Sequence, residues 1–373
     1  MPEHHLSNIQ SVHRWWPSTS KPLLISGPCS VETELQLITT AKQLAATHKP
    51  HFLRGGIWKP RTRPDSFEGV GVIGLEWMVN AKRETGLPII TEVATAEHVE
   101  LCLKFGFDAL WIGARTTVNP FSVQEIADAL KGVDIPIIVK NPVNPDLQLW
   151  MGAIERIARS GITKIVAMHR GFSHFGASIY RNKPMWEIPI ALKTQFPELA
   201  IFCDPSHICG RRDLLQQVAQ KALDLGMEGL MIESHIDPDK AWSDAAQQIT
   251  PDILSELINN LHVRVASTDD VHFTNELQSL RSRIDKVDEE IIHLIKDRMN
   301  ITEELGHYKK EHNITILQVE RWKEIIETRT MLAEKLGLSS EFIERYLELL
   351  HKESIQTQTR VMNEDVDIPV AKK

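Results

Sequence analysis

Residues 51–63 read HFLRGGIWKPRTR, a short apolar run followed at once by a loop with four cations. The apolar run at 51–53 predicts a buried strand, and the glycines and proline after it predict a rigid loop. Glycine lets the backbone approach a ligand closely, and arginine presents a planar fork that matches carboxylate and phosphate. A solvated basic loop is the structural alternative. Because these cations follow a strand end beside Gly and Pro, we favour a site for small anions.

The same unit recurs through residues 21–262 as an apolar strand, a polar turn and a segment of helical period. Alternation of this kind predicts parallel strands joined by helices, and a count of eight favours a closed (β/α)8 barrel over an open sheet. We therefore expect an α/β fold, a TIM barrel, in residues 1–266. The eight predicted strands are Leu23–Ser26, His51–Leu53, Pro88–Thr91, Ala109–Ile112, Pro136–Val139, Lys164–Met168, Ala200–Cys203 and Gly229–Ile232.

A reactive polar side chain follows each of the eight predicted strands. In (β/α)8 barrels the chemistry lies on the loops after the carboxyl ends of the strands, so these side chains are expected to meet at one rim. Two phosphates and a carboxylate would satisfy the cations among them. These cations are Arg54, Lys59, Arg61, Arg115, Lys140 and Arg170.

A second group of rim residues predicts a metal site made of Cys29, His207, Glu233 and Asp244. Each alone has a structural alternative: the cysteine as a core residue, the histidine as a capping residue and Asp244 as an N-cap. Strands one, seven and eight are neighbours in a closed barrel, so we interpret the four together as ligands. One sulfur, one nitrogen and two carboxylates suit Mn²⁺, Fe²⁺, Co²⁺ or Zn²⁺ better than Mg²⁺ or Ca²⁺.

Composition narrows the class of protein. The 373 residues are 42% hydrophobic, enough for a full core, and the net charge of -8 argues against nucleic acid as a partner. The first 24 residues have no apolar core of a signal peptide, and no run of 18 apolar residues occurs, so no membrane partner is expected. The four cysteines show no C-x-x-C spacing. We expect a cytoplasmic protein.

Residues 267–373 predict helix only, in an all-α three-helix domain. The expected helices are Glu276–Lys310, Val319–Leu336 and Ser340–Val361, with Asn275 and Gln278 placed like a capping box at the first. The first helix carries a 3-4 apolar repeat and would be roughly 50 Å long, too long for its own short domain to cover. We therefore expect it to dimerise with a second copy of the chain.

Arg298 interrupts this apolar stripe. A cation there needs a carboxylate partner or an anionic ligand. Lys309 falls near the same face, whereas Arg281 lies roughly 25 Å along the axis. Snorkelling to solvent is the alternative for Arg281 and Lys309.

The strand-end motifs resemble those of the 3-deoxy-D-arabino-heptulosonate 7-phosphate (DAHP) synthases. The resemblance implies condensation of phosphoenolpyruvate with erythrose 4-phosphate, the first step of the shikimate route. A related group that makes an eight-carbon sugar acid has K-A-N-R where this chain has Lys-Pro-Arg-Thr, which favours the four-carbon aldose. The motifs are GPCS at 27–30, LRGG at 53–56, KPRT at 59–62, GAR at 113–115, HRG at 169–171 and DPSH at 204–207.

This resemblance also implies roles for single residues. The phosphate of phosphoenolpyruvate is assigned to Arg115, Lys140 and Arg170, and its carboxylate to Arg54, Lys59 and Lys140. The aldose phosphate is assigned to Arg61 and Thr62, and Lys59 is the expected catalytic residue. His169 stands where the family more often has Glu, and no role is assigned to it. Further substrate contacts are expected from Glu92, Asp204 and Ser206.

Residues 274–360 resemble the small all-helical chorismate mutases. The resemblance implies that Arg298 and a partner chain's Arg281 bind the carboxylates of chorismate, with Lys309 and Gln358 as catalytic residues at the ether oxygen. Two usual acidic positions are Gln318 and Trp322 here, and Glu320 or Glu324 could take over their contact. A degenerate domain that serves dimerisation and product sensing is the alternative. The matching residues are Arg281, Arg298, Lys309, Arg321, Ser354 and Gln358.

Overall fold

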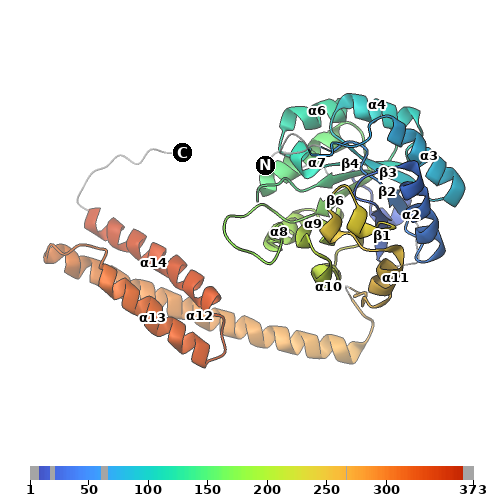
Figure 1. Ribbon diagram of the computed structural model, residues 1–373. Helices are drawn as coiled ribbons and strands as arrows, with labels where there is room; N and C mark the ends of the chain where they lie inside the picture. Colours follow the sequence, from blue (N-terminus) through green and yellow to red (C-terminus); the bar gives the residue numbers. More distant parts are fainter. Residues whose placement is uncertain (1–7, 17–21, 60–65, 266, 364–373) are drawn as a thin grey trace. The chain divides into compact units, whose positions relative to one another are not determined.

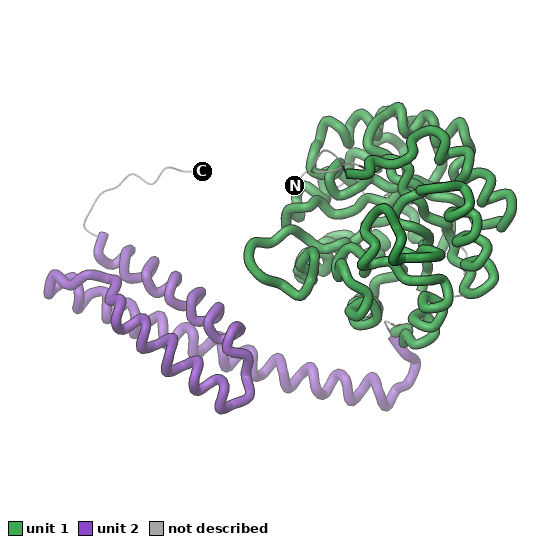
Figure 2. Tube along the Cα trace, in the orientation of Figure 1, with its two compact units in different colours: residues 1–266 green, residues 267–373 purple. Residues whose placement is uncertain are grey.

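A computed structural model describes residues 8–16, 22–59, 66–265 and 267–363. The chain divides into two compact units, Met1–Ala266 and Ser267–Lys373 (Figure 2). Among the described residues, none of the helices combines the length and the apolar character that a membrane span requires. Each unit is described below by itself.

The first unit is a closed barrel of eight parallel strands that pair in chain order (Figure 1). The predicted (β/α)8 barrel is therefore confirmed, with strand ends that differ by one or two residues. Arg54, Lys140, His169 and Glu233 are the last residues of their strands rather than the first of the loops. The strands are β1 Leu23–Gly27, β2 Phe52–Arg54, β3 Ile89–Val93, β4 Ala109–Ile112, β5 Ile137–Lys140, β6 Ile165–His169, β7 Ala200–Cys203 and β8 Gly229–Glu233.

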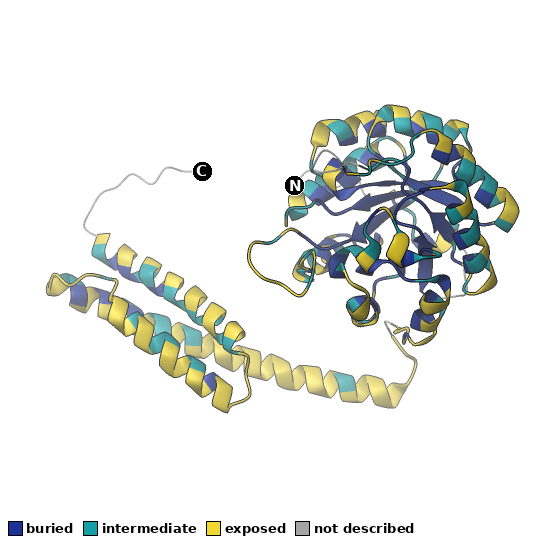
Figure 3. Ribbon diagram, viewed as in Figure 1, coloured by how far each residue is buried: buried dark blue, intermediate teal, exposed yellow. Residues whose placement is uncertain are grey.

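Helices follow the strands and turn their apolar faces inward, with exposed residues on the outer side (Figure 3). Side-chain caps start several of them, as where Thr33 accepts from the backbone N–H of Gln36. The helices are α2 Glu34–Ala46, α3 Ile73–Thr85, α4 Ala96–Lys104, α5 Ala114–Thr117, α6 Pro120–Ala129, α7 Leu147–Arg159, α8 Glu187–Gln195, α9 Pro205–Cys209, α10 Leu215–Asp224 and α11 Pro251–Asn259. Three short 3-10 turns, η1 Arg212–Leu214, η2 Pro238–Lys240 and η3 Ala245–Gln247, complete the loops after β7 and β8.

Apolar side chains fill the barrel interior and close its amino-terminal end. Helix α1, Val12–Trp15, precedes the barrel, and Val12 and Trp16 belong to the interior cluster. The Trp16 ring lies 4.8 Å from the ring of Phe52 and 5.5 Å from that of Phe202, between centroids. Because this end is packed with aromatic rings, the opposite rim is the one left for chemistry.

In residues 267–363, the described part of the second unit, the chain forms three helices, α12 Val271–Glu311, α13 Val319–Lys335 and α14 Ser340–Asn363. The predicted all-α domain is confirmed, but the predicted start of its first helix is wrong. Helix α12 begins at Val271 because Asp270 caps it, accepting from the backbone N–H of Phe273 at 3.1 Å. The capping box expected at Asn275 therefore lies inside the helix.

Candidate active sites

Arg54 is the last residue of β2, and its guanidinium is 2% exposed. Its Nη2 lies 3.0 Å from Glu233 Oε1 and 3.3 Å from the carbonyl oxygen of Cys29. The guanidinium also lies over the ring of Trp111, 4.9 Å from the centroid. Its Nε and Nη1 are buried without a hydrogen-bond partner among the described residues. Two donors of a buried cation are thus free to bind an anion.

Lys140 ends β5 and forms a buried ion pair with Asp204, with 2.7 Å between Nζ and Oδ2. Its Nζ lies 5.5 Å from the centroid of the Trp111 ring, so this ring lies under both Lys140 and Arg54. Burial by itself would raise the pKa of Asp204, but His207 and Lys140 hold it well below its ordinary value. The carboxylate is therefore charged and fixes the lysine at the rim.

Arg170 follows β6 and is 8% exposed. Its backbone N–H donates to Asn141 Oδ1 at 2.7 Å, and its Nη1 donates to Asn182 Oδ1 at 2.8 Å. The pKa of Arg170 is lowered to about 10, chiefly by burial and also by the charges of Arg181 and Arg115, while Asp204 opposes the shift. The structure thus brings several rim cations close enough to repel one another, as expected of a site that binds polyanions.

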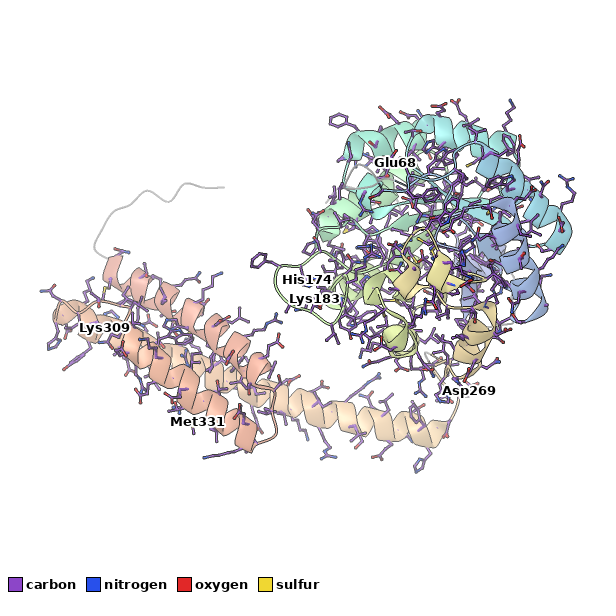
Figure 4. The ribbon with its side chains drawn as sticks, in the orientation of Figure 1. Glu68, His174, Lys183, Asp269, Lys309 and Met331 are labelled. Carbon is purple, nitrogen blue, oxygen red and sulfur yellow. The ribbon has the colours of Figure 1, made fainter. Side chains whose placement is uncertain are left out.

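The loop after β2 lies against the loop after β1. A Cβ on Gly56 would lie 2.6 Å from the carbonyl oxygen of Cys29, so only glycine fits. This close approach is to the protein backbone and not, as the sequence suggested, to a ligand. Lys59 reaches the same loop, with Nζ 2.6 Å from Cys29 Sγ, and its backbone N–H donates to the carbonyl of Glu68 (Figure 4). Arg61 and Thr62 lie outside the described residues.

The remaining predicted contacts of the barrel site fall at the same rim. Glu92 Oε2 accepts from Trp111 Nε1 at 3.1 Å, and Ser206 Oγ accepts from the backbone N–H of Glu233 at 2.9 Å. Arg115 lies in α5, directly after β4. His169 is buried beside the ring of Trp186, where burial lowers its pKa to about 3, so it is a neutral packing residue.

The four predicted metal ligands converge in two pairs. Cys29 Sγ lies 3.5 Å from Asp244 Oδ2. His207 Nε2 lies 3.6 Å from Glu233 Oε1, while its Nδ1 lies 2.8 Å from Asp204 Oδ2. Donors that bind one ion at about 2.0–2.3 Å are themselves roughly 3–4 Å apart, so both pair distances suit a shared ion. A carboxylate on the far side of the imidazole is a common support of a histidine ligand.

The electrostatics of the cluster also suit a cation. Burial raises the pKa of the Cys29 thiol to about 12, and Glu233 adds to the rise. Burial likewise opposes ionisation of Glu233, but His207 and Arg54 lower its pKa below the ordinary value. Within the described residues, no three His, Cys, Asp or Glu side chains are placed so that they could hold one metal ion together. The types of donor atom therefore fit a divalent ion, and the four side chains lie as two pairs rather than around one common point.

Arg181 is a site residue that the sequence did not indicate. It lies in the long loop after β6, and its Nη1 is 3.1 Å from Asp244 Oδ1. Burial opposes ionisation of Asp244, yet Arg181 and His207 lower its pKa below the ordinary value. No periodic pattern marks Arg181, because it lies eleven residues after Arg170 of the HRG motif.

An apolar pocket lined by Ile190, Ile201 and Met227 holds none of the predicted site residues.

In the helical unit, Arg298 of α12 reaches α14. Its Nη1 donates to Ser354 Oγ at 2.7 Å and to the carbonyl of Leu350 at 3.5 Å. Gln358 is 6% exposed, and its Oε1 has no hydrogen-bond partner in the described part of the chain. Lys309 (Figure 4) is also 6% exposed and donates to the carbonyl of Ile316 at 2.6 Å. Snorkelling is therefore wrong for Lys309.

Other predicted mutase residues lie apart from this group. Arg281 is exposed on α12, and Arg321 pairs with Glu324 at 2.7 Å on the surface of α13. Trp322, where an acid was expected, stacks on His351 of α14 with ring centroids 4.0 Å apart. Burial lowers the pKa of His351, and the charge of Arg298 adds to this, so the imidazole is neutral near pH 7. Sequence reasoning missed His351, which shares a helix face with Ser354 and Gln358.

Comparison with known proteins identifies a family for each of the two units. Residues 18–266 match the family model described as DAHP synthetase I. The chain belongs to the DAHP synthetase I family. Residues 280–359 match the model described as chorismate mutase type II, so this family member carries a chorismate mutase domain after the barrel. The two resemblances drawn from the sequence are confirmed.

Individual relatives of this DAHP synthetase I family member match the barrel. A phospho-2-dehydro-3-deoxyheptonate aldolase of Thermotoga maritima is 33% identical over 238 residues, covering 64% of this chain and 68% of the relative. A crystal structure of DAHP synthase from the same organism aligns with a TM-score of 0.57 at 32% identity, over 63% of this chain and 67% of the other. A 2-dehydro-3-deoxyphosphooctonate aldolase of Geobacter metallireducens is 26% identical, covering 65% and 92%.

Proposed function

We propose that the barrel condenses phosphoenolpyruvate with erythrose 4-phosphate and water to give DAHP and inorganic phosphate. The observation that carries this proposal is the buried guanidinium of Arg54, with two free donors, beside Lys140 at the same aromatic ring. Buried cations bind a phosphate and a carboxylate more strongly than exposed ones, because water screens them less. Phosphoenolpyruvate carries both groups on a three-carbon frame.

Different rim residues are proposed to bind different groups of the substrates. Arg54, Lys59 and Lys140 bind the carboxylate of phosphoenolpyruvate, and its phosphate is bound by Arg115, Lys140 and Arg170. Because Asp204 and Glu233 fix two of these cations before substrate arrives, little reorganisation accompanies binding. Lys59, beside Cys29, lies where it can contact either substrate. Arg61 and Thr62 are proposed for the phosphate of the aldose.

Cys29, His207, Glu233 and Asp244 are the proposed holders of a divalent transition-metal ion. When bound, such an ion polarises the aldehyde carbonyl as a Lewis acid. Asp204 orients His207 through Nδ1, which leaves Nε2 directed at Glu233. The protein thus fixes the positions of the His207 imidazole and of the carboxylates beside it.

The eight-carbon synthesis of the phosphooctonate aldolases is the second candidate for the barrel, since such a relative matches at 26% identity. The sequence Lys-Pro-Arg-Thr at 59–62 favours the four-carbon aldose. Rates with erythrose 4-phosphate and with arabinose 5-phosphate would separate the two. A higher kcat/KM for arabinose 5-phosphate would contradict our assignment.

We also propose that the helical unit rearranges chorismate to prephenate. Arg298 and Lys309 supply positive charge to a dianionic ligand, and Gln358 offers a buried amide with a free oxygen. The rearrangement needs no nucleophile, so stabilisation of developing charge is sufficient. Arg281 lies seventeen residues before Arg298, roughly 25 Å along a straight helix, and is therefore proposed to serve the site of a second copy.

The alternative is that the helical unit mainly dimerises the chain and senses pathway products. Burial of Lys309 and Gln358 favours catalysis, because a domain that only senses products has no need of a buried cation and amide for the ether oxygen. The decisive experiment measures both activities on one purified full-length chain, before and after treatment with a chelator. We expect condensation to vanish and return with Mn²⁺ or Co²⁺, while mutase activity stays unchanged. Condensation that survives complete metal removal would contradict the metal assignment, and absence of mutase activity would favour the sensing alternative.

A further inference from the structure

Two consecutive glutamines, Gln247 and Gln248, lie buried at the end of η3, next to the proposed metal ligands. Gln247 is 1% exposed and Gln248 is fully buried. Glutamine is mostly an exposed residue in proteins, so two buried neighbours require hydrogen-bond partners inside the fold. The partners that they have are the proposed ligands or residues bonded to them.

Gln248 joins the loop after β1 to the loop after β8. Its Oε1 accepts from the backbone N–H of Cys29 at 2.9 Å, and its Nε2 donates to the carbonyl of Ser243 at 2.8 Å. The hydroxyls of Ser30 and Ser243 also share a hydrogen bond. One amide therefore fixes the backbone of Cys29 relative to the residue that precedes Asp244.

Gln247 joins the two carboxylates of the cluster. Its Nε2 donates to Glu233 Oε2 at 2.7 Å, and its Oε1 accepts from Arg181 Nη1 at 2.7 Å. The same Arg181 nitrogen lies 3.1 Å from Asp244 Oδ1. The amide thus occupies Oε2 of Glu233, while Oε1 lies 3.0 Å from Arg54 Nη2 and 3.6 Å from His207 Nε2. Arg181 occupies Oδ1 of Asp244, while Oδ2 lies 3.5 Å from Cys29 Sγ.

The chemistry of these contacts requires amides. Each side chain accepts at its oxygen and donates at its nitrogen at the same time, which neither a carboxylate nor an aliphatic chain can do. Asp244 adds a second requirement, because its backbone has φ 46°, a left-handed conformation that a non-glycine residue keeps only when its surroundings hold it. The hydrogen bonds of Gln248 to Ser243 and of Arg181 to Asp244 provide that hold.

We propose that Gln247 and Gln248 are positioning residues that hold Cys29, Glu233 and Asp244 in register for the metal ion and so set the affinity of the site. This inference rests on the proposed metal site. It assigns no contact with substrate to either glutamine. Both act through the ligands that they orient.

The test measures Co²⁺ affinity of the metal-stripped full-length chain by competition with a chelating dye. The thiolate-to-cobalt absorption band is a second readout, since it reports the bond to Cys29 directly. We expect Gln247→Met and Gln248→Met each to weaken Co²⁺ binding by about 10–100-fold, the usual effect of losing a support of a metal ligand. The exposed Gln216 of α10 supplies the matched control, and Gln216→Met should leave affinity unchanged.

Two further variants distinguish the loss of a contact from the loss of the fold. Gln248→Glu keeps the acceptor for Cys29 but loses the donor to Ser243, so its affinity should fall as well. Arg181→Met changes a side chain that is 42% exposed, which the fold tolerates, and should weaken binding less than Gln247→Met. At saturating Co²⁺ we expect kcat within a few-fold of wild type for the Gln247 and Gln248 variants that retain their melting temperature.

The outcomes separate this inference from the proposed function. Wild-type affinity and an unchanged cobalt band in all four variants would overturn the positioning role while leaving the metal site intact. A wild-type chain that binds Co²⁺ without a thiolate band would overturn the ligand set itself. Weakened binding that excess Co²⁺ restores would support both.

Discussion

The cations of the barrel rim and those of the helical unit have different kinds of partner. At the barrel rim, Arg54 pairs with Glu233 and Lys140 pairs with Asp204, in both cases with buried carboxylates of the same unit. In the helical unit, Arg298 donates to a hydroxyl and a carbonyl, which are neutral, and Arg281 is exposed. These two barrel cations are therefore paired with carboxylates of their own unit, whereas the hydrogen bonds of Arg298 are made to neutral groups.

The two units also differ in how far their apolar side chains are buried. Trp111 and Ile25 are buried inside the barrel, but the predicted stripe on α12 stays exposed, with Leu280 at 44% and Ile284 at 60% (Figure 3). Apolar stripes of this size on a long helix usually face another chain. The barrel thus pairs its cations and buries its apolar residues within one unit, whereas the helical unit leaves an apolar stripe exposed.

The largest effect is expected for Cys29→Ala. A metal ion contributes several kcal/mol to such a reaction, so condensation should fall by roughly a thousandfold or more. Mutase activity should not change, because each site lies in its own unit. Rates of both reactions on the same preparation provide the measurement. Full condensation activity in metal-free Cys29→Ala protein would remove this residue from the ligand set.

Arg298→Ala and Arg281→Ala should each lower mutase kcat/KM by about 10²–10³-fold, the effect of losing one charged contact to the transition state. Condensation should persist in both. Arg345→Ala supplies a matched control on α14, since that side chain is 70% exposed. A wild-type rate in Arg281→Ala would show that the helical site is complete within one chain.

Mixing those two mutants tests directly whether the site is shared. In a mixed dimer, one site receives both lesions and the other none. Since half of randomly mixed dimers are hybrids and half of their sites are intact, about a quarter of wild-type mutase activity should return. Tagged pull-down confirms that hybrids form. Hybrids without activity would rule out the shared site.

A smaller effect is expected on regulation. If chorismate or prephenate bound near Arg298 changes condensation, the coupling should lie within about 5–150-fold, and barrel ligands must change mutase-site affinity by the same factor. Deleting residues 267–373 should then abolish the response while condensation remains measurable. Inhibition that persists in the deleted chain would locate the sensor in the barrel.

The smallest effect is expected for Ile284→Ala, on the exposed stripe of α12. Within one chain this change removes little buried surface, so its cost should stay below the roughly 2–5 kcal/mol of a core change such as Leu110→Ala. Instead, the melting temperature of the wild type should rise with protein concentration, and Ile284→Ala should weaken that dependence. Calorimetry at several concentrations measures this. A concentration-independent transition in the wild type would argue against the dimer.

Sequence patterns predicted the elements of both units closely. Strand and helix periods are local properties of the backbone, so the ends of the eight strands and of the three helices, other than the start of α12, could be predicted to within two residues. The start of α12 was missed because the signal at Asn275 resembled a cap, whereas Asp270 provides the observed one. Rim residues could be predicted as a group, because the carboxyl ends of parallel strands meet at one edge.

Local patterns in the sequence were thus sufficient to predict which residues reach the rim and which face of α12 is apolar. The pairing of each carboxylate with its cation became known from the tertiary structure, as did the hydrogen bond between Gln248 and Cys29 across 219 residues of chain. The tertiary structure also decided that Lys309 is buried and that Trp322 stacks on His351. The physical reason is range: periodicity depends on backbone geometry over a few residues, whereas these pairings depend on barrel closure and helix packing, which bring together side chains that no local pattern connects.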